Sequence, residues 1–159
     1  MENKELEDLY RQCYKPLLLY AFTLTGSRED AEDLVANTFV KALTTFQSGN
    51  VRAWMYTVMR HEFFDLQKKR KRMADAPLEE VPDGEDLLEA LVEKEQRRWL
   101  YRQIGTLPPR ERELMLLTIQ MGCRDDEIAQ ILGLTAAHVR VLRSRAKKKL
   151  LEQSKEEQP

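Results

Sequence analysis

Arginine and lysine side chains gather in the segment 124–150, near the end of the chain. Arg140, Arg143 and Lys147 recur at three- and four-residue steps, so they share one face of a helix. Guanidinium and ammonium groups on such a face donate hydrogen bonds to phosphates and to guanine edges in the major groove of DNA. No acidic residue interrupts the cations from position 136 to 151, which are Arg140, Arg143, Arg145, Lys147, Lys148 and Lys149. The pattern therefore predicts a DNA-recognition helix.

A helix-turn-helix is the element that would position these cations. Ile128 and Leu132 are four residues apart, as the buried face of a short first helix requires. Gly133 is able to take the left-handed conformation of the turn, and Thr135 is able to cap the helix that follows. The apolar stripe opposite the cations consists of Val139, Leu142, Ala146 and Leu150. The alternative is a solvated amphipathic helix, which leaves the turn residues unexplained.

The composition predicts a soluble, all-α protein. Of 159 residues, 42% are hydrophobic and 33% are charged, whereas glycine, proline and alternating β-branched residues are scarce. No apolar run approaches the roughly 20 residues that span a membrane, and the acidic N-terminus does not resemble a secretory signal. We therefore expect a cytoplasmic protein without membrane insertion.

Few residues suit catalysis or metal binding. The two histidines, His61 and His138, are far apart in the sequence, and Cys13 and Cys123 form no Cys-x-x-Cys pair. The chain also lacks a glycine-rich phosphate loop and a nucleophile–base signature. We expect reduced thiols, no metal, no cofactor and no enzymatic activity.

Charge is segregated along the chain, although the formal net charge is only −1. A basic run at 68–72 precedes an acidic stretch from 75 to 95, which also contains Pro77, Pro82 and Gly84. These helix breaks and the shortage of residues to bury predict a flexible acidic linker between two small helical domains. The predicted boundaries are 1–73 for the N-terminal helical domain, 74–86 for the linker, 87–152 for the C-terminal helix-turn-helix domain and 153–159 for a tail.

Helical periodicity predicts three helices in the first domain. The first has a break or kink at Pro16 and ends at Gly26, and the second begins at a cap formed by Ser27 with Asp30. A short loop at 47–50 leads to the third helix. The residues expected inside on that helix are Trp54, Val58, Phe63 or Phe64, and Leu66.

Four stretches, in their order along the chain, resemble the bacterial sigma factors of the extracytoplasmic-function (ECF) type. They are DAEDLVANTFVKA at 30–42, WMYTVMRHEFFD at 54–65, LPPRERE at 107–113 and the helix-turn-helix. The position of the linker and the total length also fit the two-domain architecture of that family. The likeness covers roughly three quarters of the chain, and it is the order of the motifs that makes it specific.

The resemblance implies that the second helix binds the coiled-coil clamp of core RNA polymerase. The implied contact residues are Glu32, Asp33, Ala36 and Asn37. The family usually has Gln-Glu where this chain has Ala36-Asn37, so a carboxylate and an amide are lost at that interface. Taken without the family, Asp33 is a solvated carboxylate on a helix face.

The resemblance also implies that the loop at 47–50 and the third helix recognise the −10 element, where an unstacked base of the non-template strand is captured. Tyr56 lies off the apolar stripe and is expected to stack on a base, whereas Trp54 is expected in the core. The run at 68–72 is expected to follow phosphates, with a merely solubilising run as the alternative. The implied −10 residues are Ser48, Gly49, Asn50, Arg52, Tyr56, Arg60, His61, Lys68, Lys69 and Arg70.

By the same resemblance the recognition helix reads the −35 element. Arg140 and Arg145 are expected to make bidentate contacts with guanine, whereas Arg143 and two lysines are expected to hold phosphates. Arg143 occupies a position that is often apolar in the family, with Leu142 buried one residue earlier. The implied −35 residues are Arg140, Val141, Arg143, Ser144, Arg145, Lys147 and Lys148.

The partners implied by the resemblance are core RNA polymerase and both double-stranded and melted promoter DNA, with an anti-sigma factor as a further candidate. Two other functions remain open on the residues alone. One is an autonomous helix-turn-helix regulator that binds an operator as a dimer, and the other is a helical adaptor for acidic partners. The basic run at 68–72 favours a second DNA contact over both. The acidic stretch leads to the hypothesis that it lies against the basic helices in the free protein and suppresses unproductive DNA binding.

Overall fold

A computed structural model describes residues 3–74, 95–121 and 124–157 of the chain. Within these residues it contains seven helices and no strand, which confirms the all-α prediction. The chain divides into two compact units, Met1–Pro82 and Asp83–Pro159. This boundary falls inside the segment 74–86 that we predicted as a linker. Residues 75–86 themselves lie outside the described part, so the flexible linker stays a prediction.

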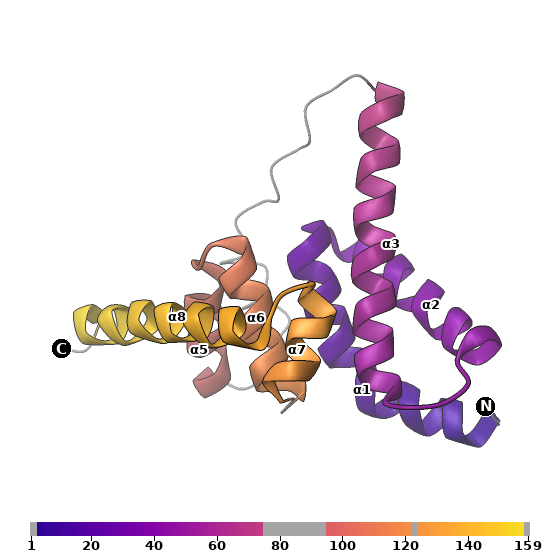
Figure 1. Ribbon diagram of the computed structural model, residues 1–159, viewed down its shortest axis with the longest axis horizontal. Helices are drawn as coiled ribbons and strands as arrows, with labels where there is room; N and C mark the ends of the chain where they lie inside the picture. The colour runs from indigo at the N-terminus through magenta and orange to yellow at the C-terminus, as the bar shows by residue number, and fades with distance from the viewer. Residues whose placement is uncertain (1–2, 75–94, 122–123, 158–159) are drawn as a thin grey trace. The chain divides into compact units, whose positions relative to one another are not determined.

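The N-terminal unit is built from three helices that pack against one another in pairs (Figure 1). They are α1 (Asn3–Thr25), α2 (Arg28–Thr45) and α3 (Val51–Ala74). The last turns of α3 extend beyond the part of the helix that α1 and α2 cover. These turns carry the basic run at 68–72, all of whose residues are exposed.

Local signals set the junction between α1 and α2 as predicted. Gly26 adopts φ 69°, and its N–H donates to the carbonyl of Phe22 at 2.8 Å, which ends α1. Ser27 caps α2, because its Oγ accepts from the N–H of Asp30 at 3.3 Å. Of the break or kink predicted at Pro16, the break is wrong, because α1 is one continuous helix with Pro16 inside it; the kink stays a prediction. Packing of the buried residues that follow Pro16 offsets the backbone hydrogen bond that a proline removes.

The buried face of α3 differs from the predicted one. Met55 and Met59 are fully buried and Phe63 is 7% exposed, whereas Phe64 and Leu66 are 38% and 43% exposed. Both α1 and α2 pack on α3, so the buried arc is broad and is centred on the methionines. The expectation that Leu66 lies inside is therefore wrong, and Phe63 is the buried member of the Phe63–Phe64 pair.

The C-terminal unit contains four described helices, with α6, α7 and α8 in mutual contact and α5 against α6 and α8. They are α5 (Glu95–Gly105), α6 (Pro109–Met121), α7 (Asp125–Leu132) and α8 (Ala136–Glu157). Its core is aliphatic, and the side chains at or near zero exposure are Ile104, Leu114, Leu116, Leu117, Ile128, Ile131 and Val139. Burial of each such side chain stabilises the unit by about 1.5–3 kcal/mol before chain entropy is counted.

The predicted turn between α7 and α8 is confirmed. Gly133 adopts φ 69° and ψ 35°, the left-handed conformation. The N–H of Leu134 donates to the carbonyl of Ala129 at 2.8 Å, and Thr135 Oγ1 accepts from the N–H of His138 at 3.1 Å. The first helix thus ends and the second begins within three residues.

Residues 153–157 of the predicted tail are helical, since α8 continues to Glu157. Gln153 contributes to this extension, because its Nε2 donates to Thr106 Oγ1 at 3.0 Å. In the three described stretches, every helix is too short or too polar to cross a bilayer.

Candidate functional site

The recognition helix α8 exposes cations on one side and buries its apolar stripe on the other. Val139, Leu142 and Ala146 are buried, and Leu150 is half-buried. The predicted DNA contacts that are exposed are Arg140, Val141, Ser144, Arg145, Lys147 and Lys148. A helix with this division is able to lie in a major groove while its other face stays attached to the domain.

Arg143 departs from the rest of this face. Its side chain is only 17% exposed, and Nη1 donates to the Asp125 carboxylate at the start of α7. Its Nη2 lies 3.4 Å from Thr118 Oγ1 on α6. The expectation that Arg143 holds a phosphate is wrong for this structure, because the guanidinium is committed to contacts between helices of the unit.

The loop at 47–50 is exposed and ends in a helix cap. Gly49 adopts φ 102°, a conformation that side chains rarely take. Asn50 Oδ1 accepts from the N–H of Ala53 at 3.2 Å, so the Asn50 side chain caps the first turn of α3. Arg52 is exposed and its Nη2 donates to Gln12 Oε1 of α1 at 3.2 Å. Ser48, Gly49, Asn50 and Arg52 thus lie together at one end of α3.

Tyr56 is not available for stacking on a base. The residue is 3% exposed, and its ring meets that of Tyr20 edge to face with centroids 5.1 Å apart. The expectation that Tyr56 lies off the apolar face is therefore wrong. Trp54 is half-buried and packs on Phe46 at 5.4 Å between ring centroids, in agreement with a core role.

The middle of α3 carries Phe64, the exposed member of the Phe63–Phe64 pair. The guanidinium of Arg60 stands 4.7 Å from the centroid of the Phe64 ring, a cation–π arrangement. His61 is exposed and lines an open pocket of about 280 Å³ together with Lys69 and with Lys41 of α2. The −10 residues predicted on this helix are therefore distributed around α3 and do not share one face.

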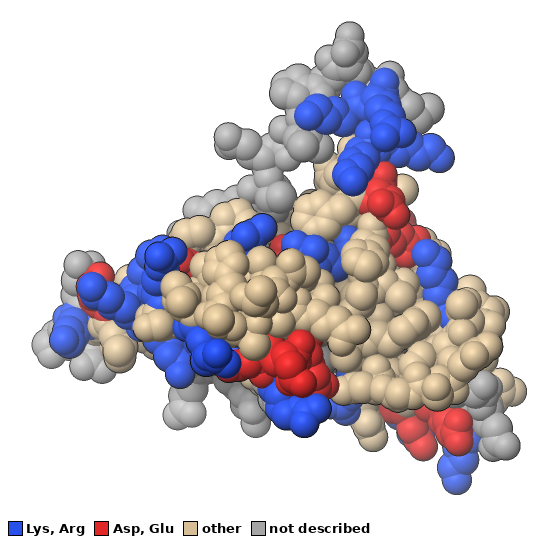
Figure 2. All heavy atoms as spheres, viewed as in Figure 1, with Lys and Arg blue, Asp and Glu red and all other residues tan. Residues whose placement is uncertain are grey.

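The end of α3 is strongly basic, and Figure 2 shows Lys and Arg side chains gathered there. Lys68, Lys69 and Arg70 are exposed, as are the two cations that follow them. Five successive cations on a helix extend in every direction around its axis. Such an end is suited to contact with phosphates from more than one side.

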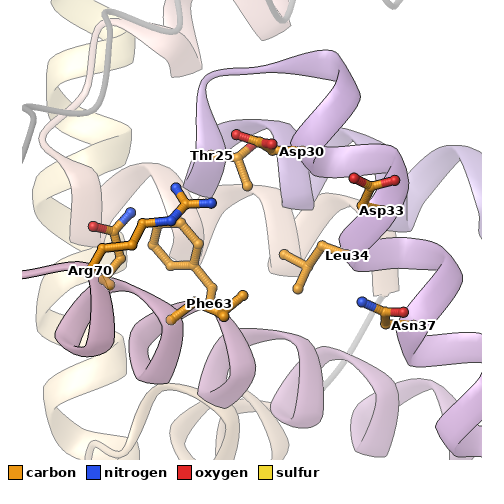
Figure 3. Close-up of a pocket in the computed structure, with 9 residues that line it drawn as sticks. Thr25, Asp30, Asp33, Leu34, Asn37, Phe63 and Arg70 are labelled. Atoms are coloured by element: carbon orange, nitrogen blue, oxygen red, sulfur yellow. The ribbon is translucent and has the colours of Figure 1, made fainter. Parts of the chain in front are cut away.

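Two of the four α2 residues predicted to bind polymerase, Asp33 and Asn37, line a pocket between α2 and α3 (Figure 3). Asp33 and Asn37 of α2 face Phe63 and Arg70 of α3 across a pocket of about 230 Å³. Ala36 is exposed and lies outside this lining. The pocket joins an acidic and amide rim to an apolar floor and one cation, which suits an amphipathic partner surface.

The Glu32 side chain forms an ion pair with Arg28 on its own helix. Its Oε1 accepts from Arg28 Nε at 3.0 Å, an exposed pair at i and i+4. Such pairs stabilise a helix by only about 0.3–0.5 kcal/mol, so the contact does not prevent Glu32 from changing partners.

Two polar residues of the C-terminal unit were missed by sequence reasoning. Asp125 receives Arg143 and lies 3.9 Å from Arg140 Nη1. Glu111, buried on α6, receives Lys149 Nζ at 2.8 and 3.1 Å. Asp125 could have been predicted from Arg143, which occupies a position that is often apolar in the family. An arginine that is buried at such a position needs a carboxylate nearby.

Two family models match the chain, one in each unit. The model for Sigma-70 region 2 matches residues 9–73, and the model for Sigma-70, region 4 matches residues 97–150. Every predicted −10 and core-binding residue lies within the first match, and every predicted −35 residue lies within the second.

Two proteins that are similar to this chain along most of its length are described as RNA polymerase sigma factors. The chain is 29% identical to the RNA polymerase sigma factor YlaC of Bacillus subtilis (strain 168), over 96% of this chain and 95% of that protein. It is 30% identical to the ECF RNA polymerase sigma factor EcfG of Rhodopseudomonas palustris (strain TIE-1), over 84% of this chain and 76% of that protein.

Solved structures share the fold. The sigma factor RpoE of Bartonella quintana, in complex with the anti-sigma factor NepR, matches with a TM-score of 0.70 at 24% identity, covering 98% of this chain and 99% of that chain. CnrH, in complex with the cytosolic domain of CnrY, matches with a TM-score of 0.66 at 21% identity, covering 99% of this chain and 92% of that chain.

Proposed function

Because the chain belongs to the RNA polymerase sigma factors of the ECF type, we propose that it binds core RNA polymerase and directs transcription initiation at specific promoters. The observation that carries this proposal is the helix-turn-helix of the C-terminal unit, whose second helix exposes cations opposite a buried apolar stripe. The polymerase performs the chemistry, and this chain contributes promoter recognition and helps to open the duplex. Its place of action is then the cytoplasm.

The −35 element is read by α8 in the major groove. Arg140 and Arg145 contact guanine through O6 and N7, and Lys147 and Lys148 hold phosphates. Val141 and Ser144, exposed between the arginines, contact base edges or thymine methyl groups. Arg143 is withdrawn from this set, since its guanidinium is held inside the unit.

The −10 element is read by the N-terminal unit. Ser48, Gly49, Asn50 and Arg52 surround an unstacked base, and the helix cap at Asn50 keeps the loop close to α3. Holding that base offsets the few kcal/mol that unstacking costs. The phosphates upstream of this base are contacted by the side chains of Arg60, His61, Lys68, Lys69 and Arg70.

Core polymerase is bound by α2. Asp33, Ala36 and Asn37 are exposed on that helix, and the pocket beside Asp33 and Asn37 extends the surface to α3. Asn37 supplies an amide where the family usually has a carboxylate, so a neutral hydrogen bond replaces a charge-assisted one at this point.

Regulation by an anti-sigma factor is part of the proposal, since RpoE of Bartonella quintana was solved in complex with one. The autonomous dimeric regulator is not favoured, because the likeness to sigma factors extends over both units.

The test is reconstitution with core RNA polymerase. The purified chain is run with core polymerase on a sizing column, and the complex then transcribes a genomic library. We expect a stoichiometric complex that produces discrete start sites which core polymerase alone does not use. The test variant is Asp33→Ala, which is expected to weaken the complex. Its control is Glu29→Ala, which removes an exposed carboxylate from the first turn of the same helix and is expected to weaken the complex less.

Absence of a complex, together with tight binding of the chain alone to a palindromic DNA, would replace the proposal by the dimeric regulator. If a complex forms but produces no new start sites, the proposed binding to polymerase stands and the proposed promoter recognition is wrong.

A further inference from the structure

Asp125 stands between the two arginines of α8 that point toward α7. Its Oδ1 accepts from Arg143 Nη1, and its Oδ2 lies 3.9 Å from Arg140 Nη1. The carboxylate is the first residue of α7, and its side chain is 28% exposed. One acidic side chain of the first helix therefore engages two successive cations of the recognition helix.

The two arginines are held to different degrees. The Arg143 side chain is 17% exposed and also reaches Thr118 on α6, so it connects three helices. The Arg140 side chain is 63% exposed and its contact with Asp125 is the longer one. Arg143 holds the carboxylate by a hydrogen bond, and the held carboxylate attracts the Arg140 guanidinium from 3.9 Å.

A restrained arginine recognises DNA differently from a mobile one. Bidentate pairing with guanine needs two N–H groups in one plane and in a defined direction. Restraint by the carboxylate lowers the conformational entropy that Arg140 loses when it forms this pair. The same negative charge opposes attachment of Arg140 to a phosphate, which is the contact that random DNA offers.

From this geometry we propose that Asp125 is a specificity-determining positioning residue, which aims Arg140 at one guanine of the −35 element and disfavours its binding to phosphates. The inference rests on the proposed function, in which α8 reads that element. Asp125 itself contacts no base.

The neighbouring residue supplies a matched control. Asp126 carries the same charge one position later, its side chain is 68% exposed, and its ion-pair partner is Arg124 at 3.6 Å. Asp125→Asn and Asp126→Asn change the net charge equally. A difference between them therefore reports the contact with α8 and not the general repulsion between protein and DNA.

The experiment uses core polymerase carrying the full chain and a library of duplexes randomised at the −35 element. Wild type is expected to enrich one sequence, and discrimination is then measured at each of its guanines against the other bases. Asp125→Asn is expected to reduce discrimination at one guanine by about tenfold, within the range that a single bidentate contact contributes, and to bind random duplex more tightly. Asp126→Asn is expected to leave discrimination at that guanine unchanged.

A double-mutant cycle separates this role from a loss of structure. In an Arg140→Ala background, Asp125→Asn is expected to cause no further loss of discrimination, because the restrained group is already absent. A purely structural effect would persist in that background and would overturn the proposal. Equal effects of Asp125→Asn and Asp126→Asn would overturn it as well. If wild type enriches no sequence, it is the proposed function that fails.

Discussion

Cationic side chains on α8 perform two tasks at the scale of single residues. Arg143 and Lys149 pair with Asp125 and Glu111 on other helices of the unit. Arg145, Lys147 and Lys148 are exposed. The number of positive charges in the sequence of this helix therefore exceeds the number that are available for the proposed contact with DNA.

Arg140→Ala and Lys148→Ala are expected to have different consequences for DNA binding. Arg140→Ala is expected to cost about 1–3 kcal/mol on the selected promoter and to relax base preference at one position. Lys148→Ala is expected to weaken all sequences alike and to reduce the salt dependence by about one phosphate contact. Binding of polymerase carrying each variant is measured on selected and random duplexes over a range of salt concentrations. Equal losses on both kinds of DNA for both variants would contradict the assignment of the recognition face.

Cys13 is a residue whose burial has a consequence for pH. It is 4% exposed, and this burial raises the pKa of its thiol above the ordinary value of 9.0, although the nearby Arg52 guanidinium opposes the rise. The folded state thus binds the proton more tightly than the unfolded state. The free energy of unfolding is unaffected by this group below the ordinary pKa, and it falls as pH rises through the ordinary value toward the raised one.

Cys13→Ala is expected to flatten the decline in stability of the N-terminal unit that sets in as pH rises through 9.0, the ordinary pKa of the thiol. Urea unfolding is followed by the fluorescence of Trp54, in a Trp99→Phe background, at several pH values. In a Cys123→Ser background, alkylation of Cys13 by iodoacetamide is expected to be slow in the native protein and fast in urea. Rapid native alkylation at pH 8 would show that the thiol is not buried as described.

At the scale of elements, α8 is attached to the unit by a turn and by two ion pairs, Arg143 with Asp125 on α7 and Lys149 with Glu111 on α6. Gly133 sets the reversal of the chain, and Thr135 caps the helix that follows. The pair between Lys149 and Glu111 then joins the later turns of α8 to α6. The exposed face of α8 is thereby held along its length and not only at the turn.

Gly133→Ala is expected to destabilise the C-terminal unit by about 1–2 kcal/mol. An added Cβ would meet no atom within 4 Å, so the cost comes from the positive φ alone and not from a clash. Gly133→Asn is expected to cost less, because asparagine tolerates this conformation. Urea unfolding monitored through Trp99, in a Trp54→Phe background, measures both variants. A loss as large for Asn as for Ala would indicate that space, not backbone conformation, is limiting.

At the scale of the whole molecule, the formal charge of −1 conceals a strong segregation. Cations lie at the end of α3 and along α8, whereas the stretch from 75 to 95 is acidic. Residues 75–94 lie outside the described part of the chain, and on the charges of the sequence alone we expect the acidic stretch to compete with DNA for these helices in the free protein.

Converting Glu79, Glu80 and Asp83 to amides is therefore expected to raise the DNA affinity of the isolated chain severalfold. The matched control converts Glu5, Glu7 and Asp8, three exposed carboxylates of α1, to amides. It changes the net charge equally and is expected to have the smaller effect. Fluorescence anisotropy of a labelled random duplex measures both, and identical gains would exclude a specific role for the acidic stretch.

The sequence by itself determined the features that depend on neighbouring residues. The left-handed Gly133, the cap at Ser27 and the exposed and buried faces of α8 follow from local backbone preferences and from helical periodicity. The order of the motifs also determined the family. The turn, the cap and the faces of α8 were predictable because each one involves residues within a few turns of one another.

Only the tertiary structure decided which residues of a helix face are covered. Tyr56 is buried because two helices pack on α3 and widen its buried arc, and Tyr20 of α1 meets its ring. Arg143 turns inward because Asp125, 18 residues earlier, is brought beside it. Periodicity gives the direction of a side chain from its own helix axis, whereas burial and pairing depend on neighbours that are distant in sequence.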